Sequence, residues 1–289
     1  MSSPYVLDSQ YGGTNSLTGV DFINSLATWL ATVGWTVDYN SGSGRIHFHK
    51  DTVHMEMWSS AVVSTNVYAA ICTGYAAGQT SANQPGYSVS QNNYMYFAVG
   101  GSVYPSYLRF VSTPHAVFIF SLATYSGNQY QASLAFGRIN TKLGTWGGGE
   151  FLSCGYLSPF SSHLNYTNFV VRYNESWTPL VVAGGVNMQT DVCISLSSKM
   201  PILYSGGIIP IPQLVFKHDV SSTNLLHPIG YCPDFYLVGG GDAYLSGDIV
   251  TISGTDYLFT NGYSSEGKYN PNYNIPPYNI PNLAIAIGG

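Results

Sequence analysis

The amino-acid sequence predicts an α+β protein that is mostly β-sheet, in which one N-terminal helix packs on antiparallel sheet and a β-rich second half follows. Three observations predict this class. Apolar residues recur with the helical period in one N-terminal stretch, whereas later apolar residues alternate with polar ones, as in half-buried strands. The 32 glycines and 15 prolines divide the chain into short segments. Its 289 residues suffice for one large domain or two modest ones.

The helix is expected to follow an extended N-terminal arm, residues 1–17. Thr18 and Asp21 have the spacing of a capping box, with Thr18 as the N-cap and Asp21 at the third helical position. Gly34 ends the segment, as glycine often does at a helix C-terminus. The apolar positions between these signals follow the helical period: Val20, Ile23, Leu26, Ala27, Leu30 and Val33.

After Gly34 the apolar period changes to two, which predicts antiparallel sheet and completes an α+β domain over residues 18–157. Turn-forming sequences separate the strands, and a polar loop is expected at residues 78–93. The expected strands are residues 35–38, 45–50, 53–58, 67–73, 94–99, 106–112, 115–122 and 131–139.

A second, β-rich domain is expected over residues 158–266, where proline and glycine are more frequent. Residues 208–212 contain two prolines, so they form either an edge strand or an extended loop, because proline cannot donate to a ladder. The expected strands are residues 168–173, 180–183, 192–196, 214–217, 234–238, 249–253 and 257–260.

Residues 267–289 are expected to form an extended C-terminal arm. A Tyr-Asn unit followed by proline recurs there, and this spacing of prolines favours a polyproline-like conformation. An apolar tip, residues 283–287, follows the repeat and suits docking on a neighbouring subunit; the alternative is a tail that folds back on its own domain. The residues expected at an interface with a neighbour are Tyr269, Tyr273, Pro276, Tyr278 and Pro281.

The composition is unusual in its low charge. Charged residues make up 8% of the chain, against about 25% in an ordinary soluble domain. With 24 Tyr, 13 Phe and 5 Trp the chain is not of the disordered type. Because charge keeps copies of a protein apart and aromatic residues suit interfaces, this composition favours permanent contact with other subunits. The alternative is a secreted, neutral β-protein that faces carbohydrate.

Charge and hydropathy also exclude two classes of partner. The net charge is -5 and the 9 basic residues are scattered, so we expect no nucleic acid as a partner. The N-terminus lacks the pattern of a signal peptide, and the longest apolar runs are too short to span a membrane.

The four cysteines, Cys72, Cys154, Cys193 and Cys232, are too widely spaced for a C-x-x-C site. We expect reduced, mostly buried thiols, with two disulfides as the alternative.

One hairpin carries the best candidate for a metal site. If Asp51 and Thr52 form its turn, one sheet face presents His47, His49, His54 and Glu56, which could bind a transition metal. The opposite face would present Ile46, Phe48, Val53, Met55 and Met57. The same alternation also arises if the apolar face packs on the helix while the polar face meets solvent or another chain. We favour this second interpretation and expect neither a metal nor another cofactor.

No catalytic constellation stands out. The chain contains neither a G-x-S-x-G nucleophile elbow nor an H-E-x-x-H metal motif. Glu150, beside three glycines, could serve as a general acid only with a partner carboxylate nearby. The sequence therefore favours a protein that is not an enzyme.

The order of several short motifs resembles a group of structural proteins of tailed-bacteriophage virions. Members carry a Gly-Trp-Thr after an N-terminal helix and an FGR-type segment before a GxWxGG block. Here these are residues 34–36, 136–139 and 144–151, followed by a small-residue stretch at 153–156. The resemblance covers residues 19–156, whereas the C-terminal half matches only in its Tyr, Pro and Gly content. A third glycine and Glu150 extend the block beyond the usual pattern, and the N-terminal arm is longer than usual.

The resemblance implies a virion component of the tail, baseplate or neck that is assembled in the host cytoplasm. Its implied partners are other virion structural proteins and copies of itself, and it implies no catalytic residues. Two alternatives remain open. One is a receptor- or carbohydrate-binding module of the tail-fibre or lectin type, with a host-surface glycan as partner, and the other is a capsid decoration protein.

Overall fold

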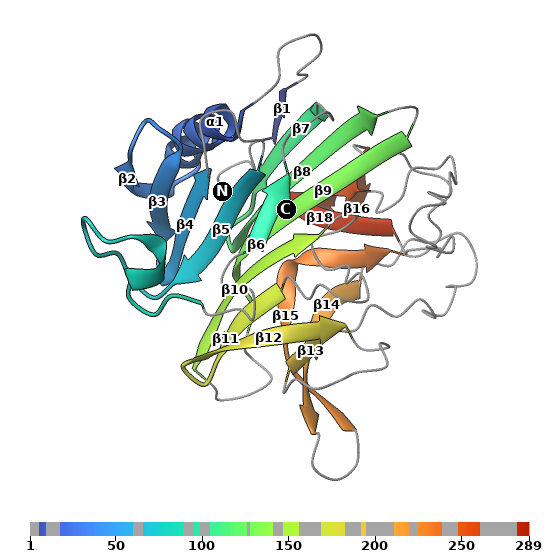
Figure 1. The fold of residues 1–289 in the computed structure, drawn as a ribbon. Helices are drawn as coiled ribbons and strands as arrows, with labels where there is room; N and C mark the ends of the chain where they lie inside the picture. The colour runs from blue at the N-terminus through green and yellow to red at the C-terminus, as the bar shows by residue number, and fades with distance from the viewer. Residues whose placement is uncertain are drawn as a thin grey trace.

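The computed structural model confirms the predicted α+β, mostly β, class (Figure 1). It contains one α-helix, and two sheets built almost entirely of antiparallel pairs, among the residues that it describes. These are residues 6–9, 18–59, 66–88, 95–98, 105–125, 128–140, 147–155, 169–182, 192–194, 211–219, 225–238, 248–260 and 282–288.

The helix α1, Gly19–Thr32, has the predicted ends. The Thr18 hydroxyl oxygen accepts a hydrogen bond from the Asp21 amide at 3.1 Å, and the Asp21 carboxylate accepts one from the Thr18 amide at 3.3 Å. At the other end the Trp35 amide donates to the Leu30 carbonyl at 3.1 Å, across Gly34 with a φ of 82°. Glycine adopts this left-handed conformation without strain, so the chain can leave the helix directly into a strand.

A five-stranded antiparallel sheet follows α1, in the order β2-β3-β4-β5-β6. Its strands are β2 (Thr36–Asn40), β3 (Arg45–Lys50), β4 (Val53–Ser59), β5 (Asn66–Cys72) and β6 (Met95–Ala98). The hairpin residues predicted to share the apolar face are all buried in one cluster with the helix: Ile46, Phe48, Val53, Met55 and Met57. The helix therefore covers this sheet face, as the hydrophobic pattern predicts.

The second sheet has thirteen strands, in the order β1-β7-β8-β9-β10-β11-β12-β13-β14-β15-β18-β17-β16. Neighbours pair antiparallel except β12 and β13, which are parallel. The strands of its first part are β1 (Val6–Ser9), β7 (Pro105–Ser112), β8 (Ala116–Tyr125), β9 (Asn128–Arg138), β10 (Gly148–Gly155), β11 (Phe169–Tyr173) and β12 (Ser176–Val182). The second part contains β13 (Val192–Ile194), β14 (Ile211–Asp219), β15 (Leu225–Val238), β16 (Ile249–Ile252), β17 (Thr255–Thr260) and β18 (Asn282–Gly288).

Strands β7 to β11 are buried on both faces where the structure describes their side chains. In β8, Val117 and Ile119 join the hydrophobic cluster of α1 and the five-stranded sheet. Phe118 and Phe120 point the other way and pack with residues of β15, β17 and β18. The ring of Phe118 stacks on that of Phe235 in β15, with centroids 5.6 Å apart. The thirteen-stranded sheet thus folds over on itself, so that β7–β11 form the middle of three layers.

Aromatic side chains connect the middle layer to the helix side. The ring of Phe110 in β7 lies 5.7 Å from that of Phe22 and 5.2 Å from that of Trp29, both in α1. The ring of Phe136 in β9 meets Trp35 edge-on at 5.2 Å. Such pairs contribute about 0.5–1.5 kcal/mol beyond their buried area, so they fix how the layers pack.

The C-terminal strand corrects one expectation. Strand β18 lies between β15 and β17 of its own chain, with Ile285 paired to Phe235 and Leu258. The prediction that the apolar tip at residues 283–287 docks on a neighbouring subunit is therefore wrong, and the tip folds back instead. It does so because Ala284 and Ile285 complete a buried core that the chain itself provides. The five predicted interface residues, Tyr269, Tyr273, Pro276, Tyr278 and Pro281, lie outside the described residues.

Hydrogen bonding also crosses the predicted division between residues 157 and 158, since β10 pairs with β11. Within the expected N-terminal arm, β1 pairs with β7, so residues 6–9 belong to the sheet. Residues 148–155, which overlap the end of the glycine-rich block at residues 144–151, form β10, a strand that the sequence did not predict. Among the described residues β13 pairs with β14 only at residues 215–217, so Pro212 lies outside that pairing, where its missing N–H is tolerated.

Truncation of either buried face of the middle layer should destabilise the protein strongly. We expect Phe136→Ala and Phe118→Ala each to lower the free energy of unfolding by about 3–5 kcal/mol, because each leaves a cavity between two layers. Chemical denaturation measures the loss. The exposed Ile249→Ala is the control, with an expected change below about 0.5 kcal/mol. A small effect at Phe118 alone would show that the C-terminal strands do not cover that face.

Candidate functional site

The polar face of the β3–β4 hairpin is organised as its sequence predicts. Asp51 and Thr52 form the turn, and Asp51 has a positive φ of 51°. His47 pairs with Glu56 and His49 with His54 across the two strands. Directly opposed residues share a sheet face, so all four side chains lie on the face away from the helix.

A loop of the same chain covers part of this face. We call residues 73–88 the flap; it includes the 3₁₀ turn η1 (Ser81–Asn83). Gln84 is buried and holds the flap together by hydrogen bonds. Its side chain accepts one from the Ala76 amide at 2.7 Å and donates one to the Gln79 carbonyl at 3.3 Å. The flap is also anchored to β12, where the Trp177 indole donates to the Gly86 carbonyl at 2.6 Å.

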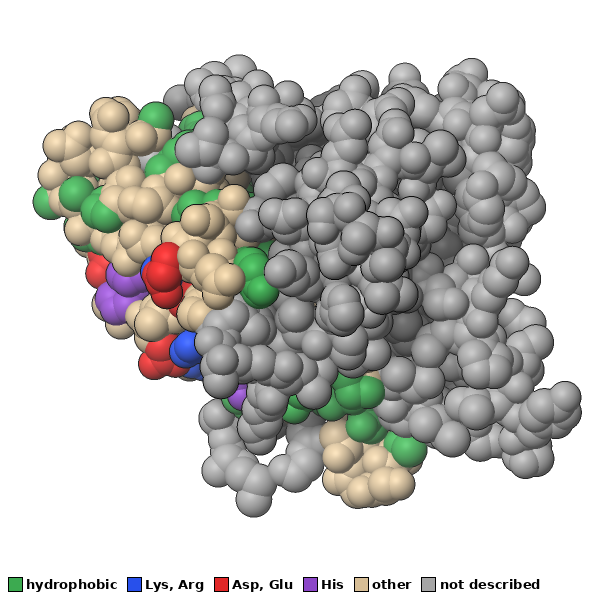
Figure 2. All heavy atoms as spheres, turned by 90° about the horizontal axis from the view of Figure 1, so that it is seen from below, with side chains coloured by type: hydrophobic (Ala, Val, Ile, Leu, Met, Phe, Trp, Pro, Cys, Tyr) green, Lys and Arg blue, Asp and Glu red, His purple; other side chains and the backbone are tan. Residues whose placement is uncertain are grey.

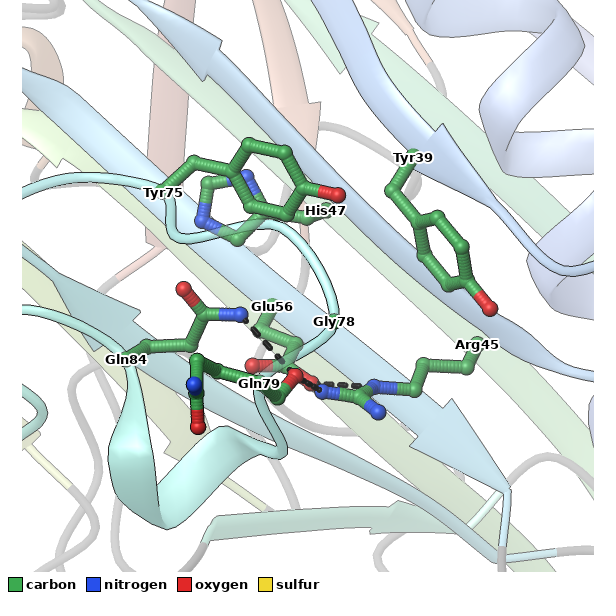
Figure 3. Close-up of a pocket in the computed structure, with 8 residues that line it drawn as sticks. All are labelled: Tyr39, Arg45, His47, Glu56, Tyr75, Gly78, Gln79 and Gln84. Atoms are coloured by element: carbon green, nitrogen blue, oxygen red, sulfur yellow. Dashed lines mark hydrogen bonds and ion pairs between the residues drawn. The ribbon is translucent and has the colours of Figure 1, made fainter.

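A cavity of about 110 Å³ lies between the flap and the sheet (Figure 3). Tyr39 and Tyr75 stand on opposite sides of it, and charged and amide side chains lie between and below them in this view. The residues that line it are Tyr39, Arg45, His47, Glu56, Tyr75, Gly78, Gln79 and Gln84. The cavity thus combines aromatic rings with hydrogen-bonding groups.

Glu56 is the fully buried carboxylate of the cavity. The Arg45 Nε donates to one of its oxygens, Oε1, at 2.5 Å, and the same guanidinium also donates to the Gln79 carbonyl of the flap. The other oxygen, Oε2, is buried without a hydrogen-bond partner among the described residues. Burial raises the pKa of Glu56, and the bond and charge of Arg45 oppose this rise. The hydrogen bond from Arg45 to the Gln79 carbonyl therefore fastens the flap to the sheet.

His47 is 1% exposed and lies under the flap, with its ring 4.6 Å from that of Tyr75. Its Nδ1 lies 3.0 Å from the Asp38 carboxylate oxygen Oδ2. Burial lowers the pKa of His47, whereas the hydrogen bond to Asp38 acts in the opposite direction. His47 therefore serves as a packed, hydrogen-bonded side chain of the interior.

His49 and His54 lie at the rim of the face, where they are half-buried. Their rings stack at 4.9 Å with an interplanar angle of 16°. The His49 Nδ1 lies 2.8 Å from the same Asp38 oxygen that His47 contacts. Burial lowers the pKa of His54, and the neighbouring rings of His49 and His47 lower it further. In the space-filling view, histidine and charged side chains gather on the side of the five-stranded sheet (Figure 2).

The structure corrects one expectation for this face and adds one residue to it. The prediction that the whole face meets solvent or another chain is wrong for His47 and Glu56, because the flap buries them. The sequence also missed Asp38, which a bulge in β2 places beside the histidines: Val37 pairs with Phe48 and Tyr39 with His47, which leaves Asp38 unpaired between them. Strict alternation of apolar and polar residues in the sequence does not reveal a residue that a bulge brings to this face.

Glu150 has the contacts of a structural side chain. It is buried, accepts a hydrogen bond from the Thr52 hydroxyl at 2.6 Å, and lies 3.6 Å from the Arg172 guanidinium. Arg172 also forms an ion pair with Glu175. Through these contacts Glu150 joins the hairpin turn to the middle layer, which accounts for a buried carboxylate at this position.

Compared with models of known protein families, the chain matches none, and no curated protein matches its sequence. Among the described residues, α1 falls short of the length and apolar character that a membrane-spanning helix needs.

Cys72 and Cys232 are free, buried thiols. Burial raises the pKa of Cys72 to about 12, and the nearby charge of Glu56 adds to the shift. We expect iodoacetamide at mildly alkaline pH to leave both cysteines largely unmodified in the native protein and to alkylate both after unfolding, as measured by peptide mass spectrometry. Equal rates in the two states would contradict the burial of these thiols.

Loss of one partner of the Arg45–Glu56 pair should cost more than loss of both. We expect Arg45→Met to lower the free energy of unfolding by roughly 3–5 kcal/mol, because it leaves the buried Glu56 charge uncompensated. The double variant Arg45→Met/Glu56→Met should recover most of this loss in chemical denaturation. Glu175→Gln, at an exposed ion pair, is the control and should cost less than about 1 kcal/mol. Additive effects of the two changes would count against a coupled pair.

Proposed function

We propose that the protein is a structural subunit of a tailed-bacteriophage virion, in the tail, baseplate or neck, that assembles through the edges of its sheets. Its partners in this proposal are copies of itself and other virion structural proteins, which meet in the host cytoplasm during assembly. The motif order described above supports the virion assignment. The surface chemistry and one edge of the large sheet support assembly.

The observation that carries the assembly proposal is the edge strand β16. It ends the thirteen-stranded sheet in the part of the chain that the structure describes. Its sequence is Ile-Val-Thr-Ile, which contains no charged residue and no proline. Ile249 in this strand is 57% exposed. Monomeric proteins usually protect such edges with charge, proline or a bulge, because an open edge can pair with a strand of another chain. An unprotected edge therefore suits a subunit that pairs with a neighbour.

The low charge of the chain supports the same conclusion. With 8% charged residues, repulsion between copies is weak, which is a disadvantage for an isolated soluble protein and none for a subunit of an assembly. The charged residues described at the candidate site pair across neighbouring strands of one sheet, as Arg45 does with Glu56 and Arg172 with Glu150. This use of charge is structural and does not require chemistry on a substrate.

A lysine at the edge should block assembly. We expect Ile249→Lys to remain folded by circular dichroism but to enter virions at least about tenfold less than the wild type, because lysine places a charge where a neighbouring strand would pair. Incorporation is measured by complementing a phage that lacks the protein and quantifying it in purified particles. Ala31→Lys, on the exposed side of α1, is the matched control and should assemble normally. Normal incorporation of Ile249→Lys would refute assembly through this edge.

The cavity favours a second candidate function, a receptor- or carbohydrate-binding module. Tyr39 is 40% exposed and stands beside Arg45, whose guanidinium carbon lies 6.0 Å from the centre of the tyrosine ring. Tyr75 faces it across the cavity (Figure 3). Aromatic rings next to hydrogen-bonding groups suit a sugar, which stacks one face and bonds with its hydroxyls. The third hypothesis from the sequence, a capsid decoration protein, would use the same edge strand, β16.

Binding to a panel of bacterial surface glycans separates the second candidate from the first. If the cavity holds sugar, Tyr39→Ala and Tyr75→Ala should abolish binding, whereas Tyr68→Ala, in β5, should not. Absence of binding to every glycan in the panel, together with normal virion incorporation of Tyr39→Ala, would leave the purely structural function.

A further inference from the structure

We propose that Asp38, His49 and His54 form a binding site for a transition-metal ion of the zinc type at the rim of the β3–β4 face. The site goes beyond the proposed assembly function and does not depend on it. Two imidazoles and one carboxylate provide the nitrogen and oxygen donors that zinc takes in proteins, and three protein ligands leave one position open.

The geometry of the three side chains carries the proposal. Each offers one ligand atom, and these atoms all lie within 4.8 Å of one another. Zinc holds its nitrogen and oxygen ligands at about 2.0–2.2 Å, so two ligands of one tetrahedral ion stand roughly 3.3–3.5 Å apart. Small rotations of side chains would bring the three atoms into this range. The structure thus places the three side chains near enough for one ion to contact all of them.

Hydrogen bonds already orient the ligands. The Asp38 Oδ2 lies 2.8 Å from Nδ1 of His49 and 3.0 Å from Nδ1 of His47. In metal sites a carboxylate commonly accepts a hydrogen bond from the histidine ring nitrogen that does not bind the ion, and this bond fixes the ring and its tautomer. The bond from Nδ1 of His49 to Asp38 thus leaves Nε2 of His49 for the ion. His47, buried under the flap, is in this arrangement a positioning residue, since it holds the Asp38 side chain in place.

One nitrogen at the site has no partner. The His54 Nδ1 is buried and makes no hydrogen bond with any residue that the structure describes. Buried polar atoms in native proteins are nearly always satisfied, so a ring nitrogen without a partner among the described residues suits a ligand such as a metal ion.

The supporting strands suit a metal site. The ligands come from β2, β3 and β4, three neighbouring strands whose opposite face is packed against the helix. Asp38 reaches them through the β2 bulge, and a residue on the regular register would point elsewhere. All three ligands are half-buried, so an ion can enter from solvent while the strands hold the donors. Binding would fasten the β2 edge to the hairpin.

Titration of the purified, chelator-treated full-length protein with Zn²⁺ and with Co²⁺ tests the site. We expect saturable binding of one ion per chain, seen by calorimetry for Zn²⁺ and by visible absorption bands for Co²⁺. The variants His49→Gln, His54→Gln and Asp38→Asn keep side-chain size, and each should lose the bands while its circular dichroism stays unchanged. His47→Gln should bind with the same stoichiometry but about tenfold more weakly.

His115→Gln is the matched control, because His115 is an exposed histidine that also contacts a carboxylate, Asp234, at 3.1 Å. It should bind Zn²⁺ as the wild type does. Absence of saturable binding by the wild type, or full retention of binding in the double variant His49→Gln/His54→Gln, would overturn the proposal. Neither outcome bears on assembly through β16, so failure of the site and failure of the proposed function are distinguishable.

Discussion

Strands β7 to β11 have apolar side chains on both faces, and the need to cover both determines the arrangement of the other elements. In β8 alone, five consecutive residues from Ala116 to Phe120 are buried and alternate between two hydrophobic clusters. One face receives α1 and the five-stranded sheet, which precede most of the middle layer in the chain (Figure 1). The other receives β15, β17 and β18, which come from the far end. Segments at both ends of the sequence are thus joined through one layer.

This arrangement also explains where the polar chemistry lies. The five-stranded sheet buries one face against α1 and the middle layer, so its other face can carry His47, His49, His54 and Glu56 at no cost to the core. The flap then shields half of that face and is fastened there by Arg45. Glu150 connects the hairpin turn to β10. A rigid polar face with one open rim results.

Local signals predicted the helix and the hairpin, because a capping box fixes a helix start and a two-residue turn fixes which strand residues oppose each other. The features that the sequence missed depend on long-range contacts. Asp38 joins the site through a bulge that breaks the alternation of side chains along β2. The flap, a loop later in the chain, covers His47. Strand β18 follows a proline-rich segment that suggested an arm, yet its apolar residues complete a core formed far earlier in the chain. Pairing partners so distant leave no periodic signature.

The two-sided burial of the middle layer is tested most directly by hydrogen–deuterium exchange of the native protein. Amides of β8 and β9 should exchange slowest of all, at rates set by global unfolding, because both of their faces and both of their edges are covered. Amides of the edge strand β16 should exchange much faster. If β8 and β9 instead exchange as fast as β16, the middle layer is open on one face and the three-layer account is wrong.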